Sequence, residues 1–381
     1  MKKTLAAVAV LGAFVGSALA ADVQLYGVVD TGLRYTHFDG DAAAAGYDAV
    51  DKFEMKSGQQ SGSRFGFKGT EDLGNGLTVG FILENQFNSD DGSLSDSNHF
   101  FRREASLFLE GGFGKITMGR IGSINNGVSS WAQFGMLSAF GTSWDYSAQV
   151  GTWAVGAGIW DNMIAYQTPT FAGFTVYAQY GMGSNNNENE SSSDRYYALG
   201  AKYANGPLNL YLAVDSINYQ TADLTAGVNA DDIDDSLTVT FGGNYDFEVV
   251  KLFAGAQYYD EAKISTAFGL LDSADYNAQT YAGKFKGWSL GVSASIPAAG
   301  GQVLVGAGYM DAEAADSQKA AKDDELTRWV VSAGYDYPLS KRTNVYGILT
   351  YAQDSLDYTD TAAKDQDPTV FAAMIGLRHK F

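Results

Sequence analysis

The most regular feature of the chain is an alternation of apolar and polar residues with a period of two. It runs through residues 62–71 and 77–87. The last segment repeats it, with Phe371, Ala373 and Ile375 on one side of the chain. Such alternation is typical of a β-strand whose two faces meet different surroundings. The pattern therefore predicts an all-β fold.

The connections between the alternating segments differ in length in a regular way. Short turns, rich in Gly and Asn, lie at 72–76, 111–114, 204–207 and 298–301. Long polar connections lie at about 39–60, 184–194, 221–235, 312–324 and 355–368. A soluble sandwich with an apolar core and a membrane barrel with an apolar outer face share the period of two. Because short turns alternate with long loops, the chain favours the barrel.

The alternating segments number about sixteen, close to the strand number at which a barrel encloses an aqueous channel. Their centres fall near residues 28, 66, 82, 106, 118, 165, 178, 199, 214, 241, 255, 290, 306, 331, 349 and 375. The stretch at 262–284 fits no clear pattern, so the count could differ by one pair. We therefore expect a 16-stranded antiparallel transmembrane β-barrel.

One segment, 121–160, lacks sustained alternation but is rich in tryptophan. It holds four of the six Trp residues of the chain. These are Trp131, Trp144, Trp153 and Trp160. So many aromatic side chains are poorly suited to a disordered loop, and loops of this length are usually functional or disordered. We expect an ordered loop, the third long one, that folds into the barrel and narrows its lumen.

Composition agrees with a strand-rich exported protein. The chain holds 23 Tyr, 22 Phe and 45 Gly but only 5 Pro, and it has no run long and apolar enough for a membrane helix. Lys2 and Lys3 precede the apolar run 5–15, and Ala18 and Ala20 form a small-residue cleavage pattern. Residues 1–20 are thus predicted to be a signal peptide, and 21–381 the mature barrel.

Charge and reactive residues exclude several function classes. Loss of Lys2 and Lys3 takes the net charge from −19 to about −21, which disfavours binding to nucleic acid. The chain has no Cys and only three separated His, so neither a nucleophilic site nor a His-based metal site is supported. We expect no cofactor and no enzyme activity.

Acidic residues are clustered in the long loops. These clusters are either ordinary solvated surface or a vestibule that concentrates cations. Their members include Asp39, Asp41, Asp48, Asp51, Glu54, Asp231, Asp232, Asp234, Asp235, Asp323, Asp324 and Glu325.

Five segments, in order along the mature chain, resemble the general trimeric porins of Gram-negative bacteria, specifically their β-proteobacterial branch. The segments are 23–30 (VQLYGVVD), 63–74 (SRFGFKGTEDLG), 111–120 (GGFGKITMGR), 161–174, which begins with DN and ends with PTFAGF, and 376–381 (GLRHKF). The resemblance implies a homotrimer in the outer membrane, in contact with its lipid and lipopolysaccharide. It also implies an inward third loop and recognition of the C-terminal Phe381 by the barrel-assembly machinery.

The resemblance further implies a constriction where wall cations face the third loop. The candidate wall residues are Arg64, Arg120, Arg103, Arg102, Lys68 and Arg34, and the candidate loop residues are Asp145, Trp131, Trp144 and Trp153. Arg103 matches the family position, whereas the alternation favours Arg102, so both are retained. Asp145 is the only charged residue between Ile121 and Trp160, which departs from the acidic loop of many relatives.

The sequence therefore predicts an outer-membrane pore for passive diffusion of ions and small hydrophilic solutes. A substrate-specific channel is the main alternative, with the Trp-rich loop as a stacking platform for sugars or aromatic solutes. A structural or adhesive barrel is a further alternative. The basic wall favours anions and the acidic loops favour cations, so the sequence leaves the ion selectivity open.

Overall fold

The computed structural model describes residues 23–39, 49–141, 144, 152–153, 158–183, 193–219, 234–262, 284–316, 325–357, 365 and 367–381. Its strands are β1 (Gln24–Asp39), β2 (Ala49–Ser57), β3 (Arg64–Gly74), β4 (Leu77–Gln86), β5 (Glu104–Gly111), β6 (Gly114–Gly122), β7 (Ile159–Gln167), β8 (Phe174–Gly181), β9 (Arg195–Asn205), β10 (Leu208–Asn218), β11 (Leu237–Asp246), β12 (Lys251–Ala262), β13 (Phe285–Ala298), β14 (Gly301–Ala314), β15 (Glu325–Pro338), β16 (Thr343–Asp357) and β17 (Thr369–Lys380). A short 3₁₀ turn, η1, covers Phe134–Met136. No helix in these ranges is long and apolar enough to cross a membrane.

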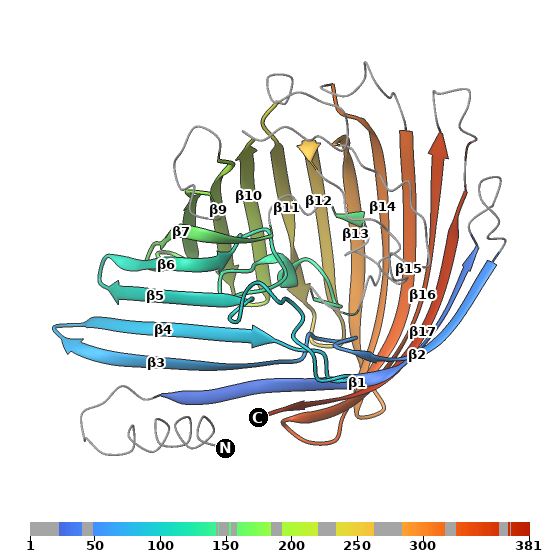
Figure 1. Cartoon of the computed structure of the whole chain (residues 1–381), viewed down its shortest axis with the longest axis horizontal. Helices are drawn as coiled ribbons and strands as arrows, with labels where there is room; N and C mark the ends of the chain where they lie inside the picture. The colour runs from blue at the N-terminus through green and yellow to red at the C-terminus, as the bar shows by residue number, and fades with distance from the viewer. Residues whose placement is uncertain are drawn as a thin grey trace.

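The strands form one closed antiparallel ring. From β3 onward each strand pairs with its neighbour in the chain, and β17 pairs with β1 to close the ring. Strands β9–β17 stand side by side along one wall, and β3–β6 lie across the view at a steep angle to them (Figure 1). Every predicted strand centre falls within a strand, and the four predicted short turns join consecutive strands. The barrel prediction is confirmed.

Strand β2 corrects one sequence prediction, because it lies within the stretch 39–60 that was expected to be a loop. Both β2 and β3 pair with the same edge of β1, β2 with residues 31–39 and β3 with residues 24–28. They share one position, so the seventeen strands fill sixteen positions in the ring. The charged residues of β2 made it resemble a polar loop, but Glu54 faces Arg34 across the strand pair.

Between β2 and β3, residues 58–63 leave the wall and bend into the barrel. The backbone N–H groups of Gln60 and Ser61 donate to Oδ2 of Asp30 at 2.9 and 2.7 Å. The side-chain amide of Gln60 donates to Oδ2 of Asp336 on β15 at 2.9 Å. We call residues 58–63 the inner segment. Because its polar groups are bonded to two walls, it is a fixed part of the lumen.

The outer face of the ring is apolar and the inner face polar, as in a barrel with lipid outside and water inside. Leu199 and Ile375, each 61% exposed, lie on the outer face. Outward aromatic rings gather in two belts. Pairs near the long connections are Trp288–Tyr309 and Trp329–Tyr351. Pairs near the short turns are Phe174–Tyr203 and Tyr245–Phe247. Two such belts mark the boundaries of a membrane-spanning band.

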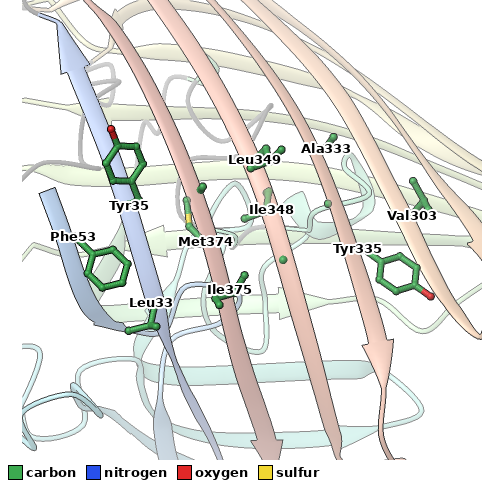
Figure 2. A pocket seen from close by; sticks show the side chains of 13 residues that line it. Leu33, Tyr35, Phe53, Val303, Ala333, Tyr335, Ile348, Leu349, Met374 and Ile375 are labelled. Atoms are coloured by element: carbon green, nitrogen blue, oxygen red, sulfur yellow. The ribbon is translucent and has the colours of Figure 1, made fainter. Parts of the chain in front are cut away.

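A shallow apolar groove of about 770 Å³ interrupts the outer face on β14–β17, β1 and β2. Figure 2 shows its side chains spread over these neighbouring strands, with Phe53 and Tyr335 toward opposite sides of the view. Its floor is low because small residues lie there: Ala333, Gly347 and Ala373. We call this surface the outer groove.

The C-terminal residue closes the seam between the first and last strands. Gly27 and Phe381 exchange two backbone hydrogen bonds of 3.1 Å each. The Phe381 ring lies over Gly27, where an added Cβ would be 2.3 Å from Cζ of the ring and 2.5 Å from the carbonyl oxygen of Arg64. The absence of a side chain at residue 27 is therefore a condition for this closure.

Replacing Gly27 by Val should displace the Phe381 ring and strain the seam. We expect the free energy of unfolding to fall by about 1–3 kcal/mol, the usual cost of overpacking. The urea midpoint of the barrel in detergent, followed by Trp fluorescence, measures this. Gly112→Val is the matched control, because no heavy atom lies within 4 Å of a Cβ at that position. Equal midpoints for both variants would contradict the role given to Gly27.

Candidate pore constriction

Strands β3, β4 and β5 bring their polar residues onto one stretch of the inner wall. Register places Gly66 beside Glu84, and Glu84 beside Glu104. Arg64 lies beside Gln86, one step toward the long loops. The alternation of side chains places all of them on the inner face, because the residues between them carry the outward apolar groups.

A single carboxylate joins two of the predicted cations at this level. Nε of Arg103 lies 2.5 Å from Oε1 of Glu84, and Nε of Arg64 lies 3.5 Å from Oε2 of the same carboxylate. Arg103 also donates from Nη1 to the Gln86 side chain at 2.9 Å. Arg64 donates to the carbonyl of Gly62 in the inner segment at 2.9 Å. The structure therefore brings Arg64 and Arg103 together.

Arg102, the alternative to Arg103, lies in another environment. It precedes β5 within the loop 88–103, and its Nη1 is 3.5 Å from the hydroxyl of Ser95 in that loop. Its backbone carbonyl accepts a hydrogen bond of 2.9 Å from Nε of Arg120. The structure thus separates the two neighbours, with Arg103 at Glu84 and Arg102 in the loop.

Arg120 also lies apart from Arg64. Its register partner is Ala105. Like Met118, two residues earlier, it occupies a position of β6 that alternates toward the outer face. Its Nη1 is 2.5 Å from Oδ1 of Asp161, at a bulge between β6 and β7 where Gly119 has a φ of +132°. The sequence placed Arg120 with Arg64, but the structure pairs it with Asp161 instead.

His99 extends this second group into the loop 88–103. Its two ring nitrogens lie 2.9 Å from Oδ2 of Asp96 and 3.6 Å from Oδ2 of Asp161. The backbone N–H of Asn98 and the His99 ring lower the pKa of Asp96 below its usual value. These contacts fasten the loop 88–103 to the β6–β7 pair.

The two remaining wall candidates both lie on the inner face but away from Glu84. Arg34 is fully buried and pairs with Glu54 on β2, with Nη2 2.5 Å from Oε1. Lys68 lies toward the short turns, with its Nζ 5.2 Å from the centre of the Tyr26 ring. The structure thus places Arg34 at Glu54 and Lys68 at the Tyr26 ring.

Arg378 joins the group although the sequence did not single it out. Arg64 interacts electrostatically with both Arg103 and Arg378. Arg378 donates from Nε to the side-chain oxygen of Asn344 at 2.9 Å, and its Nη1 is 3.5 Å from the Ser61 hydroxyl. The alternation on β17 could have identified Arg378. The exposed apolar residues Ile375 and Leu377 occupy the outward positions of this strand, which leaves Arg378 at an inward position.

Described residues of the segment 121–160 contact inner-face residues on several strands. Ser130 donates from its backbone N–H and its hydroxyl to Glu104 on β5, each at 2.8 Å. The backbone N–H of Ala139 donates to Ser293 on β13 at 2.9 Å. Asn244 on β11 donates to the carbonyl of Met136 at 2.8 Å. These described residues therefore lie against widely separated parts of the inner wall.

Three tryptophan side chains of this segment are buried by packing against other residues. Trp131, Trp144 and Trp153 are 3%, 5% and 5% exposed. Trp131 contacts the Tyr177 ring edge-on at 6.2 Å, and Trp144 contacts Tyr346 at 5.3 Å. Such burial leaves little ring surface for a stacked solute. Asp145, the one charge predicted here, lies outside the described residues.

The start of the segment is fastened by a buried polar network. Asn125 donates to Oδ1 of Asp215 on β10 at 2.9 Å and accepts a hydrogen bond of 2.8 Å from Tyr211. Tyr196 donates to Oδ2 of the same carboxylate at 3.2 Å. Because each buried group has a partner, the network fixes the beginning of the segment to the wall.

Comparison with known proteins agrees with this architecture. A family model described as Gram-negative porin matches residues 6–357. An outer membrane porin protein of Bordetella pertussis is 33% identical over 417 aligned positions that cover 100% of both chains. Outer membrane porin protein 32 of Delftia acidovorans is 32% identical, over 93% of this chain and 90% of its own. A solved structure, the anion-selective porin from Comamonas acidovorans, covers 95% of this chain and 100% of its own, with 26% identity and a TM-score of 0.65. The chain belongs to the Gram-negative porin family and is an outer-membrane porin, whose barrel forms a water-filled channel for passive diffusion of ions and small hydrophilic solutes.

Proposed function

We propose that the channel is narrowest at the level of Glu84 and that it prefers anions there. One side of this constriction is the basic wall group, Arg64, Arg103 and Arg378. The other is the segment 121–160, which folds across the lumen. The observation that carries the proposal is that Arg378 is partly exposed, whereas the carboxylates of Glu104 and Asp30 are buried.

Two carboxylates near the wall group, those of Glu104 and Asp30, are covered by hydrogen-bond donors. Glu104 is 2% exposed and accepts from Ser130 and Ser106. Asp30 is fully buried and accepts from the inner segment and from the Tyr346 hydroxyl at 2.5 Å. Arg378, by contrast, is partly exposed and has no carboxylate within 4.0 Å among the described residues. A mobile ion therefore approaches Arg378 more closely than it approaches Glu104 or Asp30.

Fixed charges on the wall act on an ion that passes through a constriction narrower than the Debye length. The Debye length at physiological salt is about 8 Å, so screening is incomplete across a narrow gap, and low-dielectric walls focus the field. The related structure from Comamonas acidovorans is described as anion-selective, which is the same preference. The buried Trp rings of the segment 121–160 favour a general channel over one that binds sugars or aromatic solutes by stacking.

We further propose that the porin assembles as a homotrimer and that the outer groove lies at a subunit contact. Small residues at the floor of a lipid-facing groove allow a second chain to approach closely. Gly347 is such a residue, and it lies between the larger walls formed by Phe53 and Tyr335. A second copy of the barrel has an apolar outer face that could pack against the apolar side chains of the outer groove.

The remaining expectations concern export and assembly. Residues 1–20, which lie outside the described residues, are proposed to be a cleaved signal peptide, with 21–381 as the mature porin. Phe381 is proposed as the residue that the barrel-assembly machinery recognises, since it is 43% exposed at the end of the last strand. Lipopolysaccharide is proposed as a neighbour in the membrane. We propose that the protein has no enzyme activity.

Arg378→Gln tests the anion preference directly. A unit charge about 7 Å from an ion in water contributes about 0.6 kcal/mol, or roughly threefold in a permeability ratio. We expect the variant to lower the anion-to-cation permeability ratio by about this factor, measured from the reversal potential of single channels in a salt gradient. Arg342→Gln is the control, because it removes the same charge from the exposed turn between β15 and β16.

Glu84→Gln should act in the opposite direction. It removes the carboxylate shared by Arg64 and Arg103, so the permeability ratio should rise by roughly threefold in the same experiment. A wild-type channel that prefers cations, or two variants that shift the ratio in the same direction, would refute the proposed constriction.

Gly347→Phe tests the subunit contact. The nearest heavy atom to a Cβ at this position is 3.6 Å away, so the single barrel has room for the side chain. The ring would fill the outer groove, and we expect the trimer to dissociate to monomers in mild detergent, as measured by light scattering. Ala256→Phe on the outer face of β12 should leave the trimer intact. An unchanged trimer in Gly347→Phe would place the contact elsewhere.

A further inference from the structure

A small pocket with both polar and apolar lining residues lies on the inner wall, between the wall group and the short turns. Its volume is about 310 Å³, and it is formed by β1, β3, β4, β5 and β6. Its inward-facing lining residues are Gln24, Lys68, Thr70, Ile82, Phe108 and Lys115. Short turns face the periplasm in barrels of this kind. The pocket is therefore near the periplasmic exit of the channel.

Two lysines in this pocket are held by aromatic rings rather than by carboxylates. Nζ of Lys115 lies 3.9 Å from the centre of the Phe108 ring, and Nζ of Lys68 lies 5.2 Å from the centre of the Tyr26 ring. Glu110 is the register partner of Lys115, but the two form no ion pair within 4.0 Å. Both ammonium groups thus keep donors available to a solute.

The pocket wall also has a well-defined apolar surface. The Phe108 ring fits over Gly80, where an added Cβ would lie 2.3 Å from Cζ of the ring. Ile82 continues this surface on the neighbouring strand. Thr70 and Gln24 add a hydroxyl and an amide at the edge, both of them exposed. The site therefore combines positive charge, hydrogen-bonding groups and an aromatic face.

We propose that this pocket transiently binds small organic anions that carry an apolar or aromatic body. The anionic group binds Lys68 and Lys115, and the body lies against Phe108 and Ile82. The volume of about 310 Å³ is about ten times the ~30 Å³ that a water molecule takes up in the liquid, so the pocket has room for an aromatic monocarboxylate. The proposal depends on the porin channel but not on where the channel is narrowest. Its consequence is a retention step for such solutes after they pass Glu84.

Benzoate is a suitable probe, because it has the required charge, ring and size. We expect benzoate on the short-turn side of a single wild-type channel to cause brief current interruptions whose frequency saturates with concentration. Neutral benzamide, which has the same shape, should cause none. Two charge-assisted contacts are lost in Lys68→Gln/Lys115→Gln, so its apparent affinity for benzoate should fall by about tenfold or more.

Lys202→Gln is the matched control, since Lys202 also faces the lumen, on β9 beside Tyr211, but lies outside the pocket. It should keep the affinity of the wild type, and Lys115→Gln alone should give an intermediate loss. Normal conductance in plain KCl shows for each variant that the channel itself is intact. Absence of saturable interruptions in the wild type, equal effects of benzamide, or equal losses in Lys202→Gln would each overturn the proposal.

Discussion

Complete pairing of the backbone in a medium without water is the constraint on which the rest of this porin depends. An unpaired N–H or C=O group in hydrocarbon costs several kcal/mol, so a membrane-spanning sheet cannot keep an open edge. Here β17 pairs with β1, and Phe381 extends that pairing to Gly27. Closure fixes the register of every strand. The register in turn decides which side chains meet lipid and which meet water.

Local patterns were sufficient for every strand except β2 and insufficient for the constriction. The period of two located the strands because each strand must present one apolar and one polar face. Strand β2 was missed because its inward charges, among them Glu54, resemble a loop when Arg34 is not known to face them. The alternation of inward and outward positions would have separated Arg120 from Arg64 and would have added Arg378. For Arg120 and Arg378 this alternation was therefore more informative than the resemblance to porin motifs.

Contacts between strands could not be inferred in the same way. The link from Arg103 to Glu84 requires knowledge of register, which is a property of the assembled sheet. It also reveals how this porin differs from the pattern expected of its relatives. Its acidic groups at this level, Glu84 and Glu104, lie on strands, and the segment 121–160 supplies hydroxyl and backbone donors such as those of Ser130. Glu84, Glu104 and Arg64 are thus held by strands, and Arg103 stands directly before β5.

The inner segment affects which insertions and deletions the chain can tolerate between β2 and β3. Ser57 faces Thr31 and Arg64 faces Val28, so six residues of the inner segment stand opposite two residues of β1, an excess of four. Because four is even, β2 and β3 both keep their apolar side chains toward lipid. A one-residue insertion within a paired strand would exchange its two faces. Insertions and deletions in steps of two at this interruption leave the faces unchanged, which makes it a place where evolution or design can enlarge or remove a projection into the lumen.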